Sequence, residues 1–288
     1  MRPDLSNEFV PQSSLLLDVR DATMPESFPS GPLCTRKSLA DNLRSLGLGT
    51  GDVLLVHSSL SSLGWVNGGA EAVVRAFLDV LGDTGTLVVP TQSSDNSDPK
   101  NWQHPPVPEE WKQTIRNTML PHNPRTTRTY HMSVIAETVR TWPGAVRSAH
   151  PQASFTAIGP KAEELMKGHA LECGLGERSP LKKLEEAKAR VLLMGVGFEK
   201  CTAFHLAEYR LPGAAVAENS FAIMMEGKRE WMTVSDVDVS DEGFRELGRE
   251  FEGEGKVKSG KIGGADARLF GLADGVDFAQ RWLLLNRS

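Results

Sequence analysis

A strand, a loop rich in serine and glycine, a helix, a turn and a second strand follow one another within about 40 residues. This succession limits the possible fold more than any other feature of the chain. Residues 52–57 and 86–90 are short apolar runs typical of buried strands. Between them, residues 70–81 have an apolar face at helical spacing, and a glycine-containing turn follows. Strands joined through a helix in this way form a βαβ crossover, so we predict an α/β protein.

The first helix signal in the sequence separates an N-terminal extension from the domain that follows. Thr35 is a suitable N-cap for a helix whose leucines recur at helical spacing until Gly47. Residues 1–34 are polar, contain prolines and show little periodicity. We therefore expect an N-terminal extension over residues 1–34 and one domain over residues 35–288.

The C-terminal part adds another strand, a hairpin and helices. Residues 191–197 are an apolar run that ends in glycines, as a buried strand would. Residues 220–225 and 230–234 are strand-like and flank a turn, which predicts a β-hairpin. Residues 262–270 are weakly strand-like, and a last helix is expected over residues 276–286. These elements predict a C-terminal subdomain of hairpin and helix, added to the α/β part.

The segment from Gln92 to about Arg128 interrupts this pattern. It is polar at first and then contains scattered prolines and tryptophans, and connections this long without regular structure are uncommon and usually functional. Because it follows a strand, we expect it to form one wall of a substrate cleft, with Asp95 and Asp98 as contacts for a cationic amine. The alternative is a surface insertion whose carboxylates are only solvated.

Charge and composition narrow the class of partner. The chain has 32 Lys and Arg against 37 Asp and Glu, a net charge of -5, which argues against nucleic acid and suits a cationic small molecule. No apolar run approaches the ~20 residues of a membrane helix, and the N-terminus has no signal-peptide pattern. Three cysteines without metal-ligand spacing suggest a reducing compartment. We expect a cytoplasmic protein, with no membrane partner, that is a monomer or a homodimer.

Residues 201–209 hold the pair of side chains best suited to catalysis. They follow the 191–197 run, at the end of a strand where open α/β sheets place their chemistry, and Thr202 is a suitable N-cap for a short helix. His205 and Glu208 are three residues apart and therefore share one helix face. An imidazole beside a carboxylate can act as a general base with its orienting partner. The alternative is a histidine and a glutamate that pair on a solvated surface.

Two other chemistries remain open for the same stretch. Cys201 lies four residues before His205 and could be a nucleophile with a histidine base, although a buried small side chain is the simpler interpretation. His205 and Glu208 could instead be two ligands of a metal in a hydrolase. No third ligand is evident nearby, and we predict no metal.

The serine-rich loop at residues 57–64 lies between a strand and a helix. Its backbone N–H groups and hydroxyls could bind an anion such as a cofactor phosphate, but it has neither the lysine of a P-loop nor the glycine spacing of a dinucleotide site. The alternative is an ordinary turn. His57 and His150 are further candidates, although a lone histidine is usually structural.

Five sequence segments, taken together and in their order along the chain, point to a protein family. They are Leu55–Gly64, Gly85–Thr91, Arg147–Phe155, Gly176–Leu181 and Thr202–Glu208. Together they resemble the motifs of the aminoglycoside 3-N-acetyltransferase family of antibiotic acetyltransferases, over about residues 36–270. The resemblance implies a central mixed sheet flanked by helices. It also implies acetyl-coenzyme A as donor and the 3-amino group of an aminoglycoside-like polyamine as acceptor.

The resemblance also implies roles for individual residues. His205 would be the catalytic histidine and Glu208 its carboxylate partner, also near the acceptor. The segment after Thr91 would shape the acceptor site. Many members have Asn where this chain has Cys201. Coenzyme A would be held by His57, Ser58, Ser59, Leu60, Ser61, Gly64, Ser154, Phe155 and Thr202.

We therefore predict direct acetyl transfer in a ternary complex, with His205 removing a proton from the amine. A donor near Ser58 or Thr202 would stabilise the oxyanion. Three alternatives remain open: a relative that acts on a different small amine, a non-catalytic coenzyme A-binding protein, and a metal-dependent hydrolase.

Overall fold

A seven-stranded sheet forms the centre of the fold, in the order β10-β11-β7-β2-β4-β6-β5. β2, β4 and β7 are parallel to one another, and each of the other neighbouring pairs is antiparallel. The sheet is therefore mixed, as the family resemblance implies. Its strands are β2 (Val53–Ser58), β4 (Thr86–Pro90), β5 (Val146–Arg147), β6 (Phe155–Ile158), β7 (Arg190–Met194), β10 (Lys258–Ile262) and β11 (Ala265–Gly271).

The computed structural model describes residues 30–287 of the chain. The expected N-terminal extension, residues 1–34, lies outside the described residues apart from its last five. Those five include β1 (Leu33–Cys34), which pairs in parallel with β3 (Trp65–Val66) as a separate two-stranded sheet.

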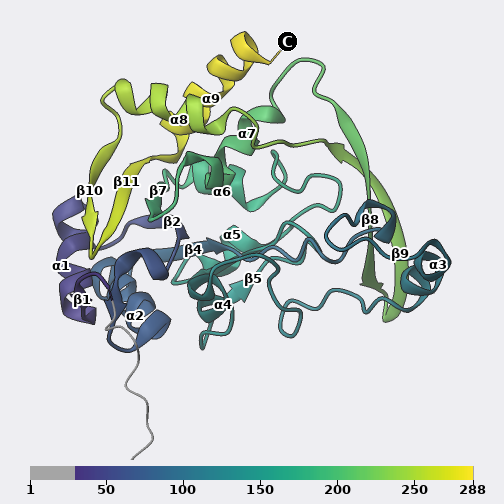
Figure 1. The fold of residues 1–288 in the computed structure, drawn as a ribbon, viewed down its shortest axis with the longest axis horizontal. Coiled ribbons are helices and arrows are strands. Elements are labelled where there is room, and N and C mark those ends of the chain that lie inside the picture. The colour runs from purple at the N-terminus through teal and green to yellow at the C-terminus, as the bar shows by residue number, and fades with distance from the viewer. Residues whose placement is uncertain (1–29, 288) are drawn as a thin grey trace, which may run out of the picture. The chain divides into compact units, whose positions relative to one another are not determined.

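Two hydrophobic cores lie on opposite faces of the central sheet, because successive side chains of a strand point to opposite sides. Val53 and Leu55 of β2 belong to one core, whereas Leu54 and Val56 belong to the other. The Leu54 face is covered by α1 (Arg36–Leu46), α2 (Gly69–Leu81) and α4 (Val134–Arg140). The Val53 face is covered by α5 (Ala162–Met166), α6 (Pro180–Glu186), α7 (His205–Glu208), α8 (Phe244–Gly253) and α9 (Leu272–Asn286) (Figure 1).

The first helix begins and ends as its sequence predicts. The Thr35 side chain accepts a hydrogen bond from the backbone N–H of Ser38, which satisfies one of the free donors at the start of α1. Gly47 ends the helix with φ of 103°, a left-handed conformation that glycine adopts without a steric penalty.

The predicted hairpin is present and longer than expected. β8 (Val216–Met225) and β9 (Lys228–Val237) are antiparallel, and they form a two-stranded sheet apart from the central one. The two turn residues, Glu226 and Gly227, have φ of 48° and 78°. Positive φ at both positions is typical of a type I′ turn, whose twist matches that of the flanking strands.

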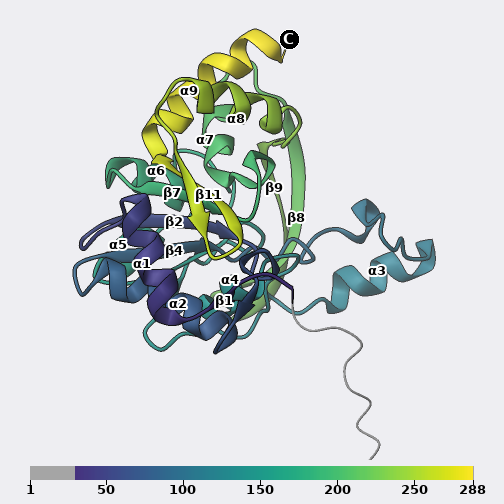
Figure 2. The ribbon, with the colours of Figure 1, turned by 60° about the vertical axis from the view of Figure 1, so that its left-hand side comes forward.

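Two expectations about local structure were wrong. The single weak strand predicted over residues 262–270 is the hairpin β10–β11, and β11 pairs with β7 as part of the central sheet. The segment over residues 92–128 contains a short 3₁₀ helix (Pro99–Asn101) and α3 (Glu109–Thr118). α3 buries none of its residues and stands away from the sheet layers (Figure 2). Over residues 30–287, no helix is both long and apolar enough to cross a membrane.

Candidate active site

The side chains of His205 and Glu208 contact each other on α7. Nδ1 of His205 lies 2.5 Å from Oε2 of Glu208. Two short 3₁₀ turns, Phe198–Lys200 and Thr202–Phe204, carry the chain from β7 to this helix. The expectation that Thr202 caps α7 was wrong, because α7 begins only at His205 and no side chain of residues 30–287 caps it.

Glu208 is held on both carboxylate oxygens. Its Oε1 accepts a hydrogen bond from the backbone N–H of Ser240 at 3.0 Å and another from the guanidinium of Arg287. Burial by itself would raise the pKa of Glu208, but these donors and His205 together hold that pKa below its ordinary value. Glu208 is therefore an ionised carboxylate at neutral pH. Because it binds Nδ1 of His205, Nε2 is the ring nitrogen left to take a proton.

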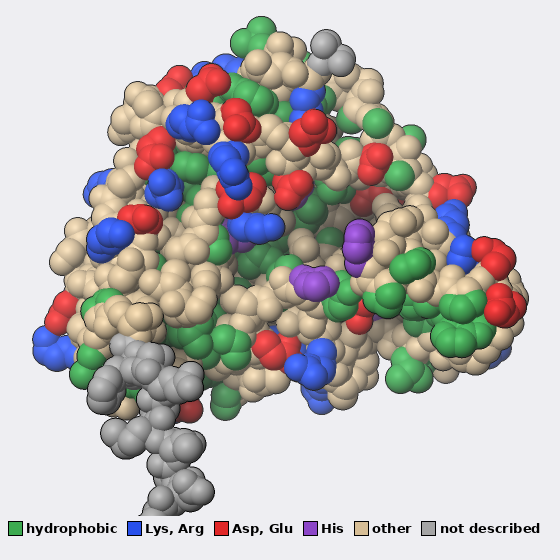
Figure 3. All heavy atoms as spheres, in the orientation of Figure 1, with side chains coloured by type: hydrophobic (Ala, Val, Ile, Leu, Met, Phe, Trp, Pro, Cys, Tyr) green, Lys and Arg blue, Asp and Glu red, His purple; other side chains and the backbone are tan. Residues whose placement is uncertain are grey.

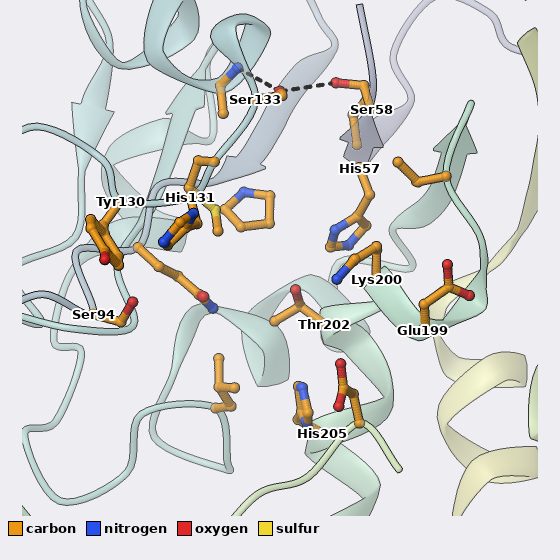
Figure 4. Close-up of a pocket in the computed structure, with 18 of the residues that line it drawn as sticks. His57, Ser58, Ser94, Tyr130, His131, Ser133, Glu199, Lys200, Thr202 and His205 are labelled. Atoms are coloured by element: carbon orange, nitrogen blue, oxygen red, sulfur yellow. Dashed lines mark hydrogen bonds between the residues drawn. The ribbon is translucent and has the colours of Figure 1, made fainter. Parts of the chain in front are cut away.

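A cavity of about 690 Å³ opens in front of His205. It lies at the carboxyl ends of the parallel strands, since His57 and Ser58 of β2 and Pro90 of β4 line it. Ligand sites in open α/β sheets occur at this edge. The side chain of Thr202 lies between His57 and His205 in the close-up (Figure 4). The space-filling view shows this face of the molecule hollowed, with histidine side chains at the hollow (Figure 3).

A second cavity, of about 870 Å³, adjoins the first along the serine-rich loop. The two share the lining residues Ser58, His131, Met132 and Ser133. Its other lining residues include Ser59, Leu60, Ser61 and Gly64, together with Gly68 and Gly69 at the start of α2. Among the described residues no side chain caps the N-terminus of α2, so its first backbone N–H groups are suited to bind an anion. A long ligand could therefore extend from the α2 terminus to His205.

Two residues expected to hold coenzyme A lie elsewhere. Ser154 and Phe155 are fully buried and line neither cavity. The hydroxyl of Ser154 donates to the backbone carbonyl of Thr91 and accepts from Nε of Arg147, and the Phe155 ring packs in the core.

The two acidic residues expected at the acceptor site also lie away from the cavities. Asp95 is exposed and Asp98 is buried, and neither lines the two cavities. A side-chain oxygen of Asp98 accepts hydrogen bonds from Arg116 at 2.8 Å and from the backbone of Lys100. Burial opposes ionisation of Asp98, yet these donors lower its pKa below the ordinary value. The negative charge of Asp98 is therefore already paired with Arg116 of the same segment.

The cavity contains residues that sequence reasoning did not single out. Tyr130, His131 and Met132 enter it from the chain just before α4. Lys200 ends the first 3₁₀ turn after β7, and Asp241 lies on the loop that follows β9. A local signal exists for the first three, because an aromatic, a histidine and a methionine directly precede the N-cap of α4. Lys200 and Asp241 have no comparable signal in the sequence.

The alternatives to a histidine base find little support in the geometry. Cys201 is buried, and burial raises the pKa of its thiol to about 12, so it is a protonated and poor nucleophile at neutral pH. Within residues 30–287, no group of three or more His, Cys, Asp or Glu side chains is arranged to hold a metal ion.

Comparison with known sequences identifies the family. The profile of the aminoglycoside 3-N-acetyltransferase family matches residues 55–284. A Bacillus subtilis relative, a prophage-derived aminoglycoside N(3')-acetyltransferase-like protein, is 47% identical over 88% of this chain and 94% of its own. Aminoglycoside N(3)-acetyltransferase III of Pseudomonas aeruginosa is 34% identical over 86% of this chain and 93% of its own.

Solved structures show the same fold. The YokD protein of Bacillus subtilis superposes with a TM-score of 0.87 at 46% identity, over 90% of this chain and 95% of that one. AAC-IIIb, solved as a binary complex with CoASH, gives 0.78 at 31% identity, over 88% and 97%. AAC-VIa bound to sisomicin gives 0.79 at 30% identity, over 88% and 98%.

The family match over residues 55–284 and the fold shared with solved acetyltransferases identify an enzyme of the acyltransferase class. More specifically, the chain belongs to the aminoglycoside 3-N-acetyltransferase family and is an N-acetyltransferase.

Proposed function

We propose that this enzyme transfers the acetyl group of acetyl-coenzyme A to the 3-amino group of an aminoglycoside, with His205 as the general base. The observation that carries the proposal is the His205–Glu208 pair at the wall of a cavity that continues into the serine-lined one. The relatives support both substrates, since one was solved with CoASH and another with sisomicin.

Both parts of acetyl-coenzyme A have a suitable surface in the second cavity. Serine hydroxyls and the N–H groups at the start of α2 suit phosphate oxygens. Apolar side chains, among them Leu60, Trp65 and Met132, suit the pantetheine arm. The thioester would then reach the shared residues near Ser58, on the side of the first cavity that faces His205.

The chemistry follows from the protonation state of the acceptor. An ammonium has no lone pair, so the acceptor must first release one proton to solvent and bind as the neutral amine. As the nitrogen attacks the thioester carbonyl, His205 takes the second proton, and Glu208 stabilises the resulting imidazolium. The C–S bond then breaks, and the thiolate recovers that proton from His205. No covalent acetyl-enzyme forms on this route.

The test is replacement of the base. His205→Ala should lower kcat by ~100-fold or more and leave the Kd of coenzyme A nearly unchanged. His104→Ala, which removes an exposed histidine outside both cavities, is the matched control and should retain full activity. Near-normal turnover of the His205 variant would refute the assignment.

A second acceptor class is favoured by the charges at the cavity. Among the described residues its lining contains two carboxylates, Glu199 and Asp241, together with the cationic Lys200. A smaller amine with one or two positive charges would match this lining. Release of free thiol from acetyl-coenzyme A, measured over a panel of aminoglycosides and small amines, separates the two acceptor classes. If no acceptor in the panel causes thiol release, neither acceptor class is supported. That result would point to a protein that binds coenzyme A without catalysis.

A further inference from the structure

His57 holds a central position in the sheet and at the site. It lies near the end of β2, which has β4 on one side and β7 on the other, and it pairs in register with Leu193 of β7. Its ring lines the same cavity as His205. The two side chains enter this cavity from opposite sides, with Thr202 between them (Figure 4).

The ring of His57 has an unused hydrogen-bonding atom. The residue is only 7% exposed, and its Nε2 is buried without a partner among the residues that the structure describes. Leaving a buried polar atom unpaired costs about 1–3 kcal/mol, so such an atom calls for an explanation.

Two other buried histidines show what a structural role looks like in this fold. His150 accepts backbone hydrogen bonds at Nδ1 and bonds the carbonyl of Leu171 through Nε2. His169 uses both ring nitrogens, toward Ser148 and Gly174. Their rings are fully engaged by the protein, whereas Nε2 of His57 has no partner among the described residues. Both ring nitrogens of His122 are also unpaired there, but of these two histidines it is His57 that lines the cavity.

We propose that His57 donates a hydrogen bond from Nε2 to the carbonyl oxygen of the thioester, and that this bond strengthens as the oxygen becomes negative during attack. The inference rests on the proposed acetyl transfer and adds a second catalytic residue to it. The family resemblance implies for His57 only a role in holding coenzyme A.

The charge state of His57 suits a hydrogen-bond donor and does not suit a general base. Burial, and in second place the nearby His205, lower the pKa of His57 to about 3, so its ring is neutral at pH 7. A neutral imidazole can still donate one N–H bond and polarise a carbonyl, and it neither gains nor loses a proton. The two histidines thus divide the work: His205 moves the proton, and His57 stabilises the oxygen.

The step balances without any further reactant. The amine lone pair forms the C–N bond, and the carbonyl π electrons move to the oxygen that His57 binds. When those electrons return, the C–S bond breaks and the thiolate leaves with the proton carried by His205. His57 has the same protons at the end as at the beginning.

The test compares a variant that lacks the donor with one that keeps it. His57→Leu should lower kcat by ~100-fold or more, as loss of one oxyanion donor does. His57→Gln, whose amide N–H can reach the position of Nε2, should retain at least ten times the kcat of His57→Leu. Both should bind coenzyme A with wild-type Kd, because free coenzyme A has no carbonyl at the thioester position, and thermal melts establish that both are folded.

Each possible result decides the role of His57. A folded His57→Leu with full kcat overturns the proposal, and so does a large loss of coenzyme A affinity with kcat unchanged, which would make His57 a binding residue only. If the acidic limb of the kcat/KM profile disappears in His57→Gln but persists in His205→Ala, His57 is the base and the proposal fails. A wild-type enzyme that releases no thiol with any amine overturns the proposed function itself, and this inference with it.

Discussion

Arg287 donates a hydrogen bond to Glu208, the same carboxylate that binds His205. The two residues are 79 positions apart, and Arg287 directly follows α9. The guanidinium of Arg287 also donates to the backbone carbonyls of Ser240 and Glu242, and it lies 5.4 Å from the centre of the Phe244 ring. The C-terminal end of the described chain therefore fixes the orienting partner of the proposed base.

Arg287→Gln should lower kcat about tenfold, equivalent to about 1.4 kcal/mol of activation free energy, with little change in the KM of either substrate. The reason is that Glu208 would lose a charged donor and hold the His205 ring less firmly. Arg287→Lys should retain more activity, because the positive charge remains. Arg281→Gln, on an exposed arginine of α9, is the control. Equal losses in the Arg281 and Arg287 variants would contradict a positioning role.

Cys201 should be dispensable for turnover. Cys201→Ala is expected to keep kcat within about threefold and to lose about 1 kcal/mol of stability, because a buried thiol is replaced by a smaller side chain. Mass spectrometry of the wild-type enzyme after incubation with acetyl-coenzyme A alone should show no added acetyl group. An acetyl group found on Cys201 would instead support the covalent route.

Local patterns predicted the parts of the fold and site that depend on neighbouring residues. The spacing of His205 and Glu208 predicted their contact, and the βαβ unit placed the serine-rich loop at the edge of the sheet where a cavity is found. Arg287 and Asp241 could not be found in this way, because they reach the site through tertiary packing from distant segments. The weak strand at residues 262–270 was misjudged because Gly263 and Gly264 belong to a turn between two strands.

Asp241 and Asp98 should respond differently to loss of charge. Asp241 is exposed at the cavity, so Asp241→Asn should raise the KM of a cationic acceptor about threefold or more with kcat little changed. Asp98→Asn should leave that KM unchanged and lower stability by about 1–3 kcal/mol, because it removes the partner of a half-buried Arg116. Steady-state kinetics and thermal melts of both variants give the comparison. A raised KM in the Asp98 variant would instead place Asp98 at the acceptor, as first expected from the sequence.

Stability should fall steeply in mild acid because four histidines are buried in their neutral form. Burial, the largest cause in each case, lowers the pKa of His57, His122 and His169 to about 3 and that of His150 to about 4. Below about pH 6.5 the unfolded chain binds protons at these rings and the folded chain does not, so the free energy of unfolding decreases as the pH falls. Each ring contributes roughly 1.4 kcal/mol per pH unit between about pH 6 and pH 4.

His122→Leu isolates one of these contributions. Both ring nitrogens of His122 are buried without a hydrogen-bond partner among the described residues, so an apolar side chain of similar size should leave stability at pH 7 unchanged or higher. The variant should also be less sensitive to acid, by roughly 1.4 kcal/mol per pH unit, because one proton fewer binds on unfolding. Urea unfolding of both proteins at pH 7, 6 and 5 measures the two slopes. Parallel slopes would mean that His122 is protonated in the folded protein as readily as in the unfolded chain, contrary to its burial.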